Sequence, residues 1–318
     1  MSSDPNRRID ADGKVYRRVR KRYLNNDLYE GEFVGAKRWG KGTYTYANGN
    51  SYTGDFKDNR LEGHGVFTWE PYAEGGVYFK NRRYEGDWLF GRMEGHGVLI
   101  VGNGDTYTGE FLKDMFSGPG TLIKANGDKL KGRWERGKLN GEAVLDFANG
   151  DKYTGVLQDG NFSNKGRLVF ARGGGWYEGD FLRGKMHGLG LRVYANGNRF
   201  EGEFEDGEVT GQGIMVFNDG SQYVGEWLSG MMHGKGVLDM PYGDRYEGDF
   251  QKNYFFGSGR YTWADGTWYE GEYVRFKGGY EHGKEFPDPD GKRNGRGTRL
   301  WLSGNKYEGE WADDLMSG

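Results

Sequence analysis

Aromatic and other apolar residues alternate with polar residues in short stretches, and the same stretch recurs along most of the chain. Tyr29-Glu-Gly-Glu-Phe33 is the first clear copy, and Tyr52-Thr-Gly-Asp-Phe56 is the next. A Gly-x-Gly segment with further alternating residues follows, such as Gly40-Lys-Gly-Thr-Tyr-Thr-Tyr46. Alternation with a period of two is typical of a strand that has one buried face. Each copy therefore predicts two short strands.

Turn signals separate these predicted strands. Asn-Gly or Asp-Gly pairs usually follow the second strand, for example Asn48-Gly49, Asn126-Gly127 and Asp219-Gly220. Such pairs tolerate the positive φ that tight turns between antiparallel strands require. Each repeat is therefore predicted to form an antiparallel β-hairpin.

The repeat has a regular period. Most successive copies start 23 residues apart, as from Tyr84 to Tyr107. The copies start at Tyr29, Tyr52, Tyr84, Tyr107, Leu130, Tyr153, Tyr177, Phe200, Tyr223, Tyr246, Tyr269 and Tyr307. Regular periods of this length are typical of stacked repeat proteins.

The composition indicates how such hairpins form a core. Glycine accounts for 60 of the 318 residues and aromatic residues for 16%, while hydrophobic residues are only 35%. We expect a core one ring deep, in which the rings of one hairpin lie over the glycines of its neighbour. The core rings expected from the repeat are Tyr29, Phe33, Tyr52, Phe56, Tyr84, Trp88, Tyr107, Phe111, Tyr177, Phe181, Phe200, Phe204, Tyr223, Trp227, Tyr246, Phe250, Tyr269 and Tyr273.

The Tyr-x-Gly-acid-aromatic and Gly-x-Gly segments with this period resemble the MORN repeat (membrane occupation and recognition nexus). The resemblance implies an all-β fold: an elongated, twisted, single-layer antiparallel sheet of stacked β-hairpins. It covers residues 29–318 as about twelve repeats, of which the last is incomplete. Residues 1–28 are a basic segment with a degenerate hairpin. Two central copies depart from the pattern, because Arg133 and Val156 replace the acid and Leu157 replaces the second ring; a local change of twist or surface is expected there.

Two insertions interrupt the period. One follows Trp69, and the other lies between Phe276 and Arg293. Insertions in stacked repeats emerge as loops on one surface. Each is interpreted either as part of a binding surface or as a tolerated loop.

Charge and cysteine content narrow the function. The net charge is −3, and because residues 1–22 sum to +5 the rest of the chain sums to −8. An acidic folded part argues against nucleic-acid binding, which needs a basic surface. The absence of cysteine excludes disulfides and fits the cytoplasm.

The sequence contains no pattern that predicts catalysis, a cofactor or a metal site. Four of the five histidines recur at repeat positions, and His282 lies in the second insertion. The acid after the glycine, such as Glu32 or Asp55, recurs in ten repeats. These carboxylates are expected either to cap a loop or pair with a nearby Lys or Arg, or to form an acidic ladder for a basic partner. The chain is predicted not to be an enzyme.

Two segments are candidate binding sites. The basic cluster Arg17, Arg18, Arg20, Lys21 and Arg22 is either a solvated edge or a contact for an anionic membrane or an acidic protein. The second segment is the predicted strand of Tyr307, Glu308, Gly309, Glu310 and Trp311, for which the sequence offers no hairpin partner. Open edges recruit further strands, so a homodimer or a partner strand is expected there.

The resemblance implies a non-enzymatic scaffold that binds other proteins through an extended β-sheet groove. Cytoskeletal or axonemal partners follow from it, as in the radial spokes of a cilium or flagellum, or at the cell cortex. The alternatives are a peripheral membrane protein that binds acidic phospholipids and the targeting segment of a larger lipid-signalling enzyme.

Overall fold

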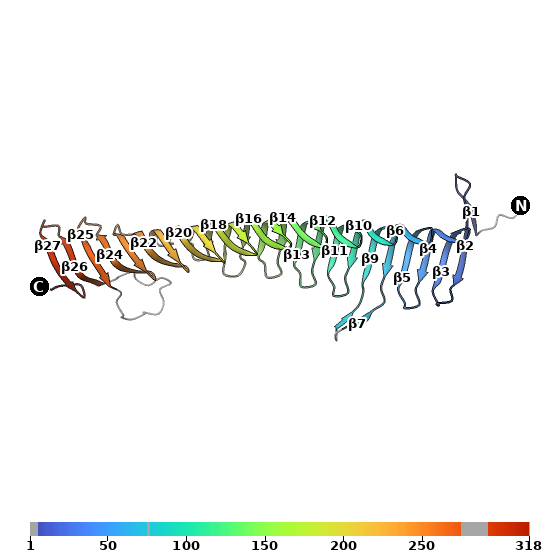
Figure 1. Ribbon diagram of the computed structural model, residues 1–318, viewed down its shortest axis with the longest axis horizontal. Helices are drawn as coiled ribbons and strands as arrows, with labels where there is room; N and C mark the ends of the chain where they lie inside the picture. Colours follow the sequence, from blue (N-terminus) through green and yellow to red (C-terminus); the bar gives the residue numbers. More distant parts are fainter. Residues whose placement is uncertain (1–5, 75–76, 275–291, 318) are drawn as a thin grey trace. The chain divides into compact units, whose positions relative to one another are not determined.

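The fold is built from antiparallel β-hairpins that follow one another in sequence order. A computed structural model describes residues 6–74, 77–274 and 292–317, and every regular element in these ranges is a β-strand. The chain divides into two compact units, Met1–Gly160 and Asn161–Gly318. Each unit contributes thirteen strands of antiparallel sheet (Figure 1). The predicted all-β sheet of stacked hairpins is therefore confirmed.

In the first unit, each strand of the sheet pairs with the next one along the chain, and β6 pairs with β9. The strands are β1 (Arg7–Ile9), β2 (Val15–Arg22), β3 (Leu28–Val34), β4 (Lys37–Thr45), β5 (Ser51–Lys57), β6 (Arg60–Thr68), β9 (Arg83–Leu89), β10 (Arg92–Ile100), β11 (Thr106–Leu112), β12 (Met115–Ile123), β13 (Lys129–Glu135), β14 (Lys138–Asp146) and β15 (Lys152–Gln158).

The second unit has the same sequential pairing. Its strands are β16 (Asn161–Val169), β17 (Gly175–Leu182), β18 (Lys185–Tyr194), β19 (Arg199–Glu205), β20 (Glu208–Val216), β21 (Gln222–Leu228), β22 (Met231–Asp239), β23 (Arg245–Gln251), β24 (Tyr254–Thr262), β25 (Trp268–Val274), β26 (Lys292–Leu300), β27 (Lys306–Ala312) and β28 (Leu315–Ser317).

The hairpin that begins at Tyr107 shows how one repeat is built. Gly109 of β11 is the partner of Gly120 of β12, and the register then shifts so that Glu110 is the partner of Ser117. The shift requires a left-handed backbone at Gly118, where φ is +58°. Such a conformation favours glycine. The first glycine of Gly-x-Gly is therefore explained by backbone conformation.

The second glycine of Gly-x-Gly is explained by the aromatic ring. A Cβ on Gly120 would lie 2.2 Å from the hydroxyl oxygen of Tyr107, and one on Gly109 would lie 2.6 Å from the same atom. The ring thus covers the glycines of its own hairpin, and the expectation that it covers those of the neighbouring hairpin is wrong. The reason is the register, which places both glycines of one hairpin opposite each other beside their own tyrosine.

The rings also join each hairpin to the next. Tyr107 contacts Phe111 of its own strand edge-to-face at 5.1 Å between centroids, and Trp134 of the next hairpin at 5.5 Å. In the second unit, Tyr223 contacts Trp227 at 5.1 Å and Phe250 at 4.9 Å in the same manner. All eighteen core rings named above are buried. Edge-to-face pairs add about 0.5–1.5 kcal/mol each beyond the burial of their area.

Side chains of the turns link adjacent hairpins at both ends of the strands. At one end, Asp128 Oδ1 accepts the backbone N–H of Ala148 at 2.8 Å. At the other, Asp114 Oδ1 accepts the N–H of Met93 at 2.8 Å. These bonds satisfy turn amides that would otherwise depend on water.

The first insertion forms a small hairpin of its own. Strands β7 (Tyr72–Glu74) and β8 (Val77–Phe79) pair only with each other and leave the main sheet (Figure 1). The Arg82 guanidinium lies 4.2 Å from the ring centroid of Trp69 at its base. The second insertion, including His282 and 275–291 as a whole, lies outside the described residues.

The basic N-terminal segment also forms a hairpin in its described part. Strand β1 pairs with β2, and β2 pairs with β3 in the register Arg20 opposite Glu30. The Arg8 guanidinium lies 3.9 Å from the ring centroid of Tyr16, which is buried. Within the part of the chain that the structure describes, no helix has the length and apolar character needed to cross a bilayer.

Candidate binding face

Strand alternation divides the sheet into a ring side and an open face. We define the open face as the side that carries the residues alternating with the rings. On the open face of the second unit, Arg260 is the register partner of Glu247 on one side and of Glu270 on the other. The buried Tyr246 lies on the opposite side, next to Glu247 in sequence. The open face is therefore the surface on which a partner can contact strand side chains.

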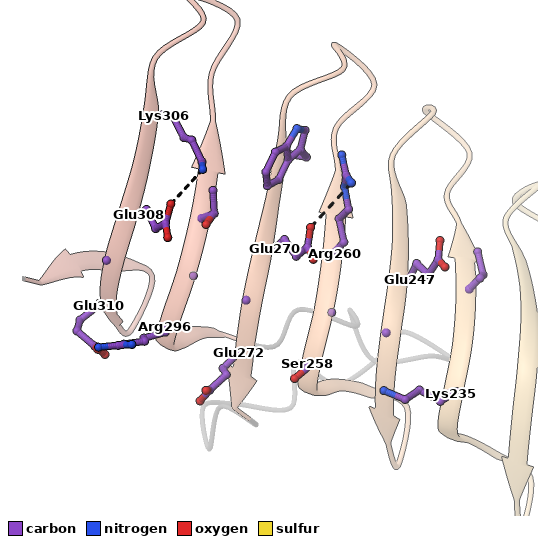
Figure 2. Close-up of a pocket in the computed structure, with 18 of the residues that line it drawn as sticks. Lys235, Glu247, Ser258, Arg260, Glu270, Glu272, Arg296, Lys306, Glu308 and Glu310 are labelled. Carbon is purple, nitrogen blue, oxygen red and sulfur yellow. Dashed lines mark hydrogen bonds and ion pairs between the residues drawn. The ribbon is translucent and has the colours of Figure 1, made fainter.

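A groove of about 1540 Å³ runs along the open face over β22–β28 (Figure 2). Glycines that are register partners cross its floor, from Gly236 opposite Gly248 to Gly297 opposite Gly309. These glycines occupy ring-side positions of their strands, so on the open face they leave a strip of backbone between the lining side chains. Figure 2 shows Lys306 and Glu308 on one side of this strip and Arg296 and Glu310 on the other.

Charged residues of opposite sign form ion pairs at the C-terminal end of the groove. Lys306 Nζ lies 3.0 Å from Glu308 Oε2, and Arg296 Nε lies 3.1 Å from Glu310 Oε1. The Arg260 guanidinium lies 4.4 Å from the ring centroid of Trp268, which also lines the groove. Exposed pairs of this kind contribute little to stability, so they can exchange their partners at small cost when a ligand binds.

Apolar side chains lead into the groove. On the open face, Ile214 is the register partner of Val224, and Val224 is the partner of Val237, which lines the groove. Ile214 is 39% exposed and Val224 is 42% exposed. Leu189 of β18, which shares this face, is 62% exposed. Contiguous exposed apolar groups are typical of interaction surfaces.

The recurring acids cap the Gly-x-Gly bulge. Asp180 Oδ2 accepts the backbone N–H of Leu189 at 3.2 Å, and the same bond links Asp249 Oδ2 to the N–H of Ser258 at 3.0 Å. Lys165 Nζ also lies 2.8 Å from Asp180 Oδ1. Both contacts support the capping and pairing interpretation of these carboxylates over the acidic ladder.

The buried tyrosines have a structural role. Tyr107 donates its hydroxyl to the carbonyl oxygen of Glu110 at 3.1 Å, and Tyr269 donates to that of Glu272 at 3.3 Å. Burial raises the pKa of both phenols to about 12, so they remain protonated donors at neutral pH. Phe200 fills the same position without a hydroxyl. These rings are therefore packing groups.

Two of the histidines within the described residues lie near recurring acids. His64 Nδ1 is 3.4 Å from Asp87 Oδ1, and His96 Nε2 is 3.8 Å from Glu110 Oε1. All four of these side chains are partly or largely exposed. In the described ranges, no group of three or more potential ligands is arranged to hold a metal ion.

The structure divides the basic cluster 17–22 between the two sides of β2. Arg18, Arg20 and Arg22 lie on the open face, where their register partners are Glu32, Glu30 and Leu28. Arg17 and Lys21 are the register partners of the core rings Phe33 and Tyr29 and so lie on the ring side. The five cations therefore do not form one surface.

The C-terminal candidate edge needs a correction. The outer side of 307–311 is not fully open, because Glu310 and Trp311 of β27 pair with Ser317 and Met316 of β28. Trp311 is buried, and its Nε1–H donates to the carbonyl oxygen of Gly297 at 3.2 Å. The sequence does not predict this strand because Leu315–Ser317 is too short to show alternation. Pairing of 306–309 with a second copy stays a prediction.

One cluster of side chains was missed in the sequence. Lys129, Lys131 and Arg133 of β13 all lie on the open face, as shown by Thr121 opposite Lys131 and Pro119 opposite Arg133. All three are exposed. The signal was present in Lys-Leu-Lys-Gly-Arg, where cations stand at positions that the preceding repeat fills with Thr106, Thr108 and Glu110.

Comparison with protein families identifies the repeat. The MORN repeat model matches eleven segments: 29–51, 52–72, 84–106, 107–129, 131–152, 177–199, 200–222, 223–245, 246–268, 290–306 and 307–318. The copy that begins at Tyr153 has no match of its own, although Tyr153 is fully buried like the other first rings. No curated protein matches the chain.

Several solved structures align with much of the chain at low identity and low TM-score. The TCP10 domain of Danio rerio CPAP is 13% identical, with 75% of this chain and 92% of that chain covered and a TM-score of 0.30. The TCP domain of Drosophila melanogaster SAS-4, in complex with a proline-rich motif of Ana2, is 12% identical, with 60% and 83% covered and a TM-score of 0.25. A virginiamycin B lyase from Staphylococcus aureus is 8% identical, with 92% and 84% covered and a TM-score of 0.15. Such low TM-scores support no conclusion about function.

Proposed function

Because the chain belongs to the MORN-repeat family, we propose that it is a non-enzymatic scaffold that binds segments of other proteins on the open face of its second unit. The observation that carries the proposal is the groove over β22–β28 together with the exposed apolar row that leads into it at Val237. Bare backbone between paired charges suits an extended polypeptide, which can offer both polar and apolar side chains to the same surface.

The family resemblance favours partners in a cytoskeletal or ciliary assembly. An extract of ciliated cells is therefore the preferred source of partners. Membrane binding is the competing function, and it would depend on cations; the groove cations Arg296 and Lys306 are instead paired with Glu310 and Glu308.

The test replaces two apolar residues of the row with acids, Ile214→Asp and Val224→Asp. The immobilised double variant and the wild type are exposed to the extract, and the bound proteins are quantified by mass spectrometry. We expect a small set of proteins to be lost at least about tenfold from the variant, because each buried charge opposes apolar contact. Vesicles with and without acidic phospholipid provide the comparison with membrane binding.

The control is Leu302→Asp, a similar change at a turn residue that is 75% exposed. It should retain the proteins that the wild type captures. Equal capture by the double variant and the wild type would contradict the proposal. Binding to acidic vesicles that both variants retain, without specific protein capture, would favour the membrane function.

A further inference from the structure

The open face of the first unit holds two sets of three cations, each on a single strand. One set is Arg18, Arg20 and Arg22 of β2, and the other is Lys129, Lys131 and Arg133 of β13, which we name the β13 strip. Alternate residues of a strand point to one face and lie about 6.6–7 Å apart. The β13 strip thus places three positive charges in a straight row across the sheet.

The cations of the strip are not neutralised by the protein. Among the residues that the structure describes, no ion pair joins Lys129, Lys131 or Arg133 to a carboxylate. The register partner of Lys129 is Asp146, but this carboxylate lies 3.0 Å from Lys152 Nζ. Elsewhere in the unit, Lys41 of the open face lies 2.8 Å from Asp55. The strip therefore retains its charge for a ligand.

The neighbouring strands distinguish the β13 strip from the cations of β2. Arg18 and Arg20 face Glu32 and Glu30 of β3, and Glu32 is itself paired with Arg8 at 3.0 Å. The strand on one side of the strip, β12, offers only Pro119, Thr121 and Ile123. On the other side, β14 offers Glu142, Val144 and Asp146, of which Asp146 is already paired. The strip therefore has only uncharged residues on its β12 side and two carboxylates, Glu142 and the already paired Asp146, on its β14 side.

The charge of the whole face indicates what kind of ligand fits. Each strip residue belongs to a row of register partners on the open face, and these three rows run across β2–β6 and β9–β15. Together the rows contain nine Lys or Arg and eight Asp or Glu, which gives a formal net charge of +1. A broad anionic surface, such as a membrane, would meet all of these residues and gain little. A ligand as narrow as one strand would contact the three strip cations directly, with Glu142 and Asp146 on the adjacent strand β14 about 5 Å to one side.

We propose that the β13 strip binds an acidic segment of a partner protein in extended conformation, with Asp or Glu at alternate positions. Alternate side chains of an extended segment have the same spacing as the three cations, so each carboxylate can meet one cation. The strip belongs to the first unit and the groove to the second, so this proposal does not depend on the proposed function. Either site can fail its test while the other passes.

The binding test uses the whole chain and three labelled peptides, measured by fluorescence anisotropy at about 0.05 M and 0.5 M salt. The first peptide alternates Glu and Thr, the second has the same composition with all Glu in one block, and the third alternates Lys and Thr. The strip variant Lys129→Thr, Lys131→Thr, Arg133→Glu copies Thr106, Thr108 and Glu110 of the preceding repeat, which keeps the strand pattern.

The wild type should bind the alternating acidic peptide best, and the strip variant should bind it about tenfold more weakly at low salt. The control variant Lys57→Thr, Lys80→Thr, Arg92→Glu changes the net charge equally at exposed sites and should lose less than about twofold. Equal losses in both variants would overturn the proposal, because they would indicate net charge alone. Equal binding of the blocked peptide would overturn the extended geometry.

A vesicle-binding experiment distinguishes a membrane ligand from a polypeptide ligand. Vesicles with about one fifth phosphatidylserine should bind neither the wild type nor the strip variant appreciably, because the three rows as a whole carry a net charge of only +1 in the wild type and −3 in the variant. Vesicle binding that the strip variant alone loses, without a preference for the alternating peptide, would assign the strip to a membrane and overturn the proposal.

Discussion

Two adjacent hairpins of the first unit fill the core between their strands with different side chains. In the hairpin of β11 and β12, Tyr107 covers Gly109 and Gly120 and stacks on Phe116 at 3.8 Å between centroids. In the hairpin of β13 and β14, Leu130 takes the place of the tyrosine.

The other side chains change with it. Leu139 stands where the first hairpin has Phe116, and Ala143 stands where it has Gly120. Leu139, Ala143 and Leu145 are all buried.

The difference teaches that the tyrosine and the second glycine depend on each other. A large ring excludes a Cβ at the second glycine of the Gly-x-Gly segment, whereas Leu130 leaves room for the Cβ of Ala143. The strand pairing is the same in both hairpins, including the register shift after the first glycine. The sheet therefore tolerates either core, provided that the volume between the strands is filled.

The largest expected effect comes from Gly120→Ala in the tyrosine hairpin. The new Cβ would lie 2.2 Å from the Tyr107 hydroxyl, and the fully buried ring has no space into which to move. We expect a loss of about 3 kcal/mol in the free energy of unfolding, measured by chemical denaturation. The control is Tyr107→Leu together with Gly120→Ala, which imitates Leu130 and Ala143. A double variant as unstable as the sum of both single variants would show that the two positions are independent.

The reverse exchange should have a smaller effect. Leu130→Tyr places a ring against the Cβ of Ala143 and against Leu139, and we expect it to cost about 2 kcal/mol. Adding Ala143→Gly should restore at least about half of that loss. The measurement is the midpoint of urea unfolding. If Ala143→Gly destabilised the Leu130→Tyr variant further, the ring would not occupy the position that Tyr107 has in its own hairpin.

The smallest expected effect concerns the turn between the two hairpins and its pH dependence. The hydrogen bond from the Ala148 N–H, with a second one from Asn126, lowers the pKa of Asp128 below its ordinary value. A carboxyl whose pKa is lowered by folding stabilises the protein above its unfolded pKa and loses this contribution as the pH falls through the folded value.

Asp128→Asn should therefore be less stable than the wild type at pH 7, by less than about 1 kcal/mol. The difference should shrink below about pH 4, where the carboxyl of the unfolded chain takes up its proton. Thermal unfolding of both proteins between pH 2 and pH 7 measures it. A difference in stability that stayed constant over this pH range would mean that the charge of the Asp128 carboxylate does not contribute to the turn. Asn198, which accepts the N–H of Asn218 at 2.9 Å, shows that the amide fits the same position.

The functional face could be predicted only in part. The alternation of Glu247 and Arg260 with buried residues gives the face on which they lie, but a groove also requires that open-face residues of successive strands come into register, as Glu247 does with Val237 and Arg260. The basic cluster 17–22 looked like one surface in the sequence. The register of β2 with β3 places its members on two sides.

The sequence by itself determined the hairpins, their order and the identity of the core rings, because alternation, turn residues and the 23-residue period are local signals. Tertiary structure decided which glycines each ring covers, since this depends on the bulge that sets Gly109 opposite Gly120. It also decided that Leu315–Ser317 pairs with β27, because three residues carry no pattern of their own and gain order only from the strand beside them. The uncompensated charge of the β13 strip likewise depends on what stands on the neighbouring strands, which the order of residues along one strand does not contain.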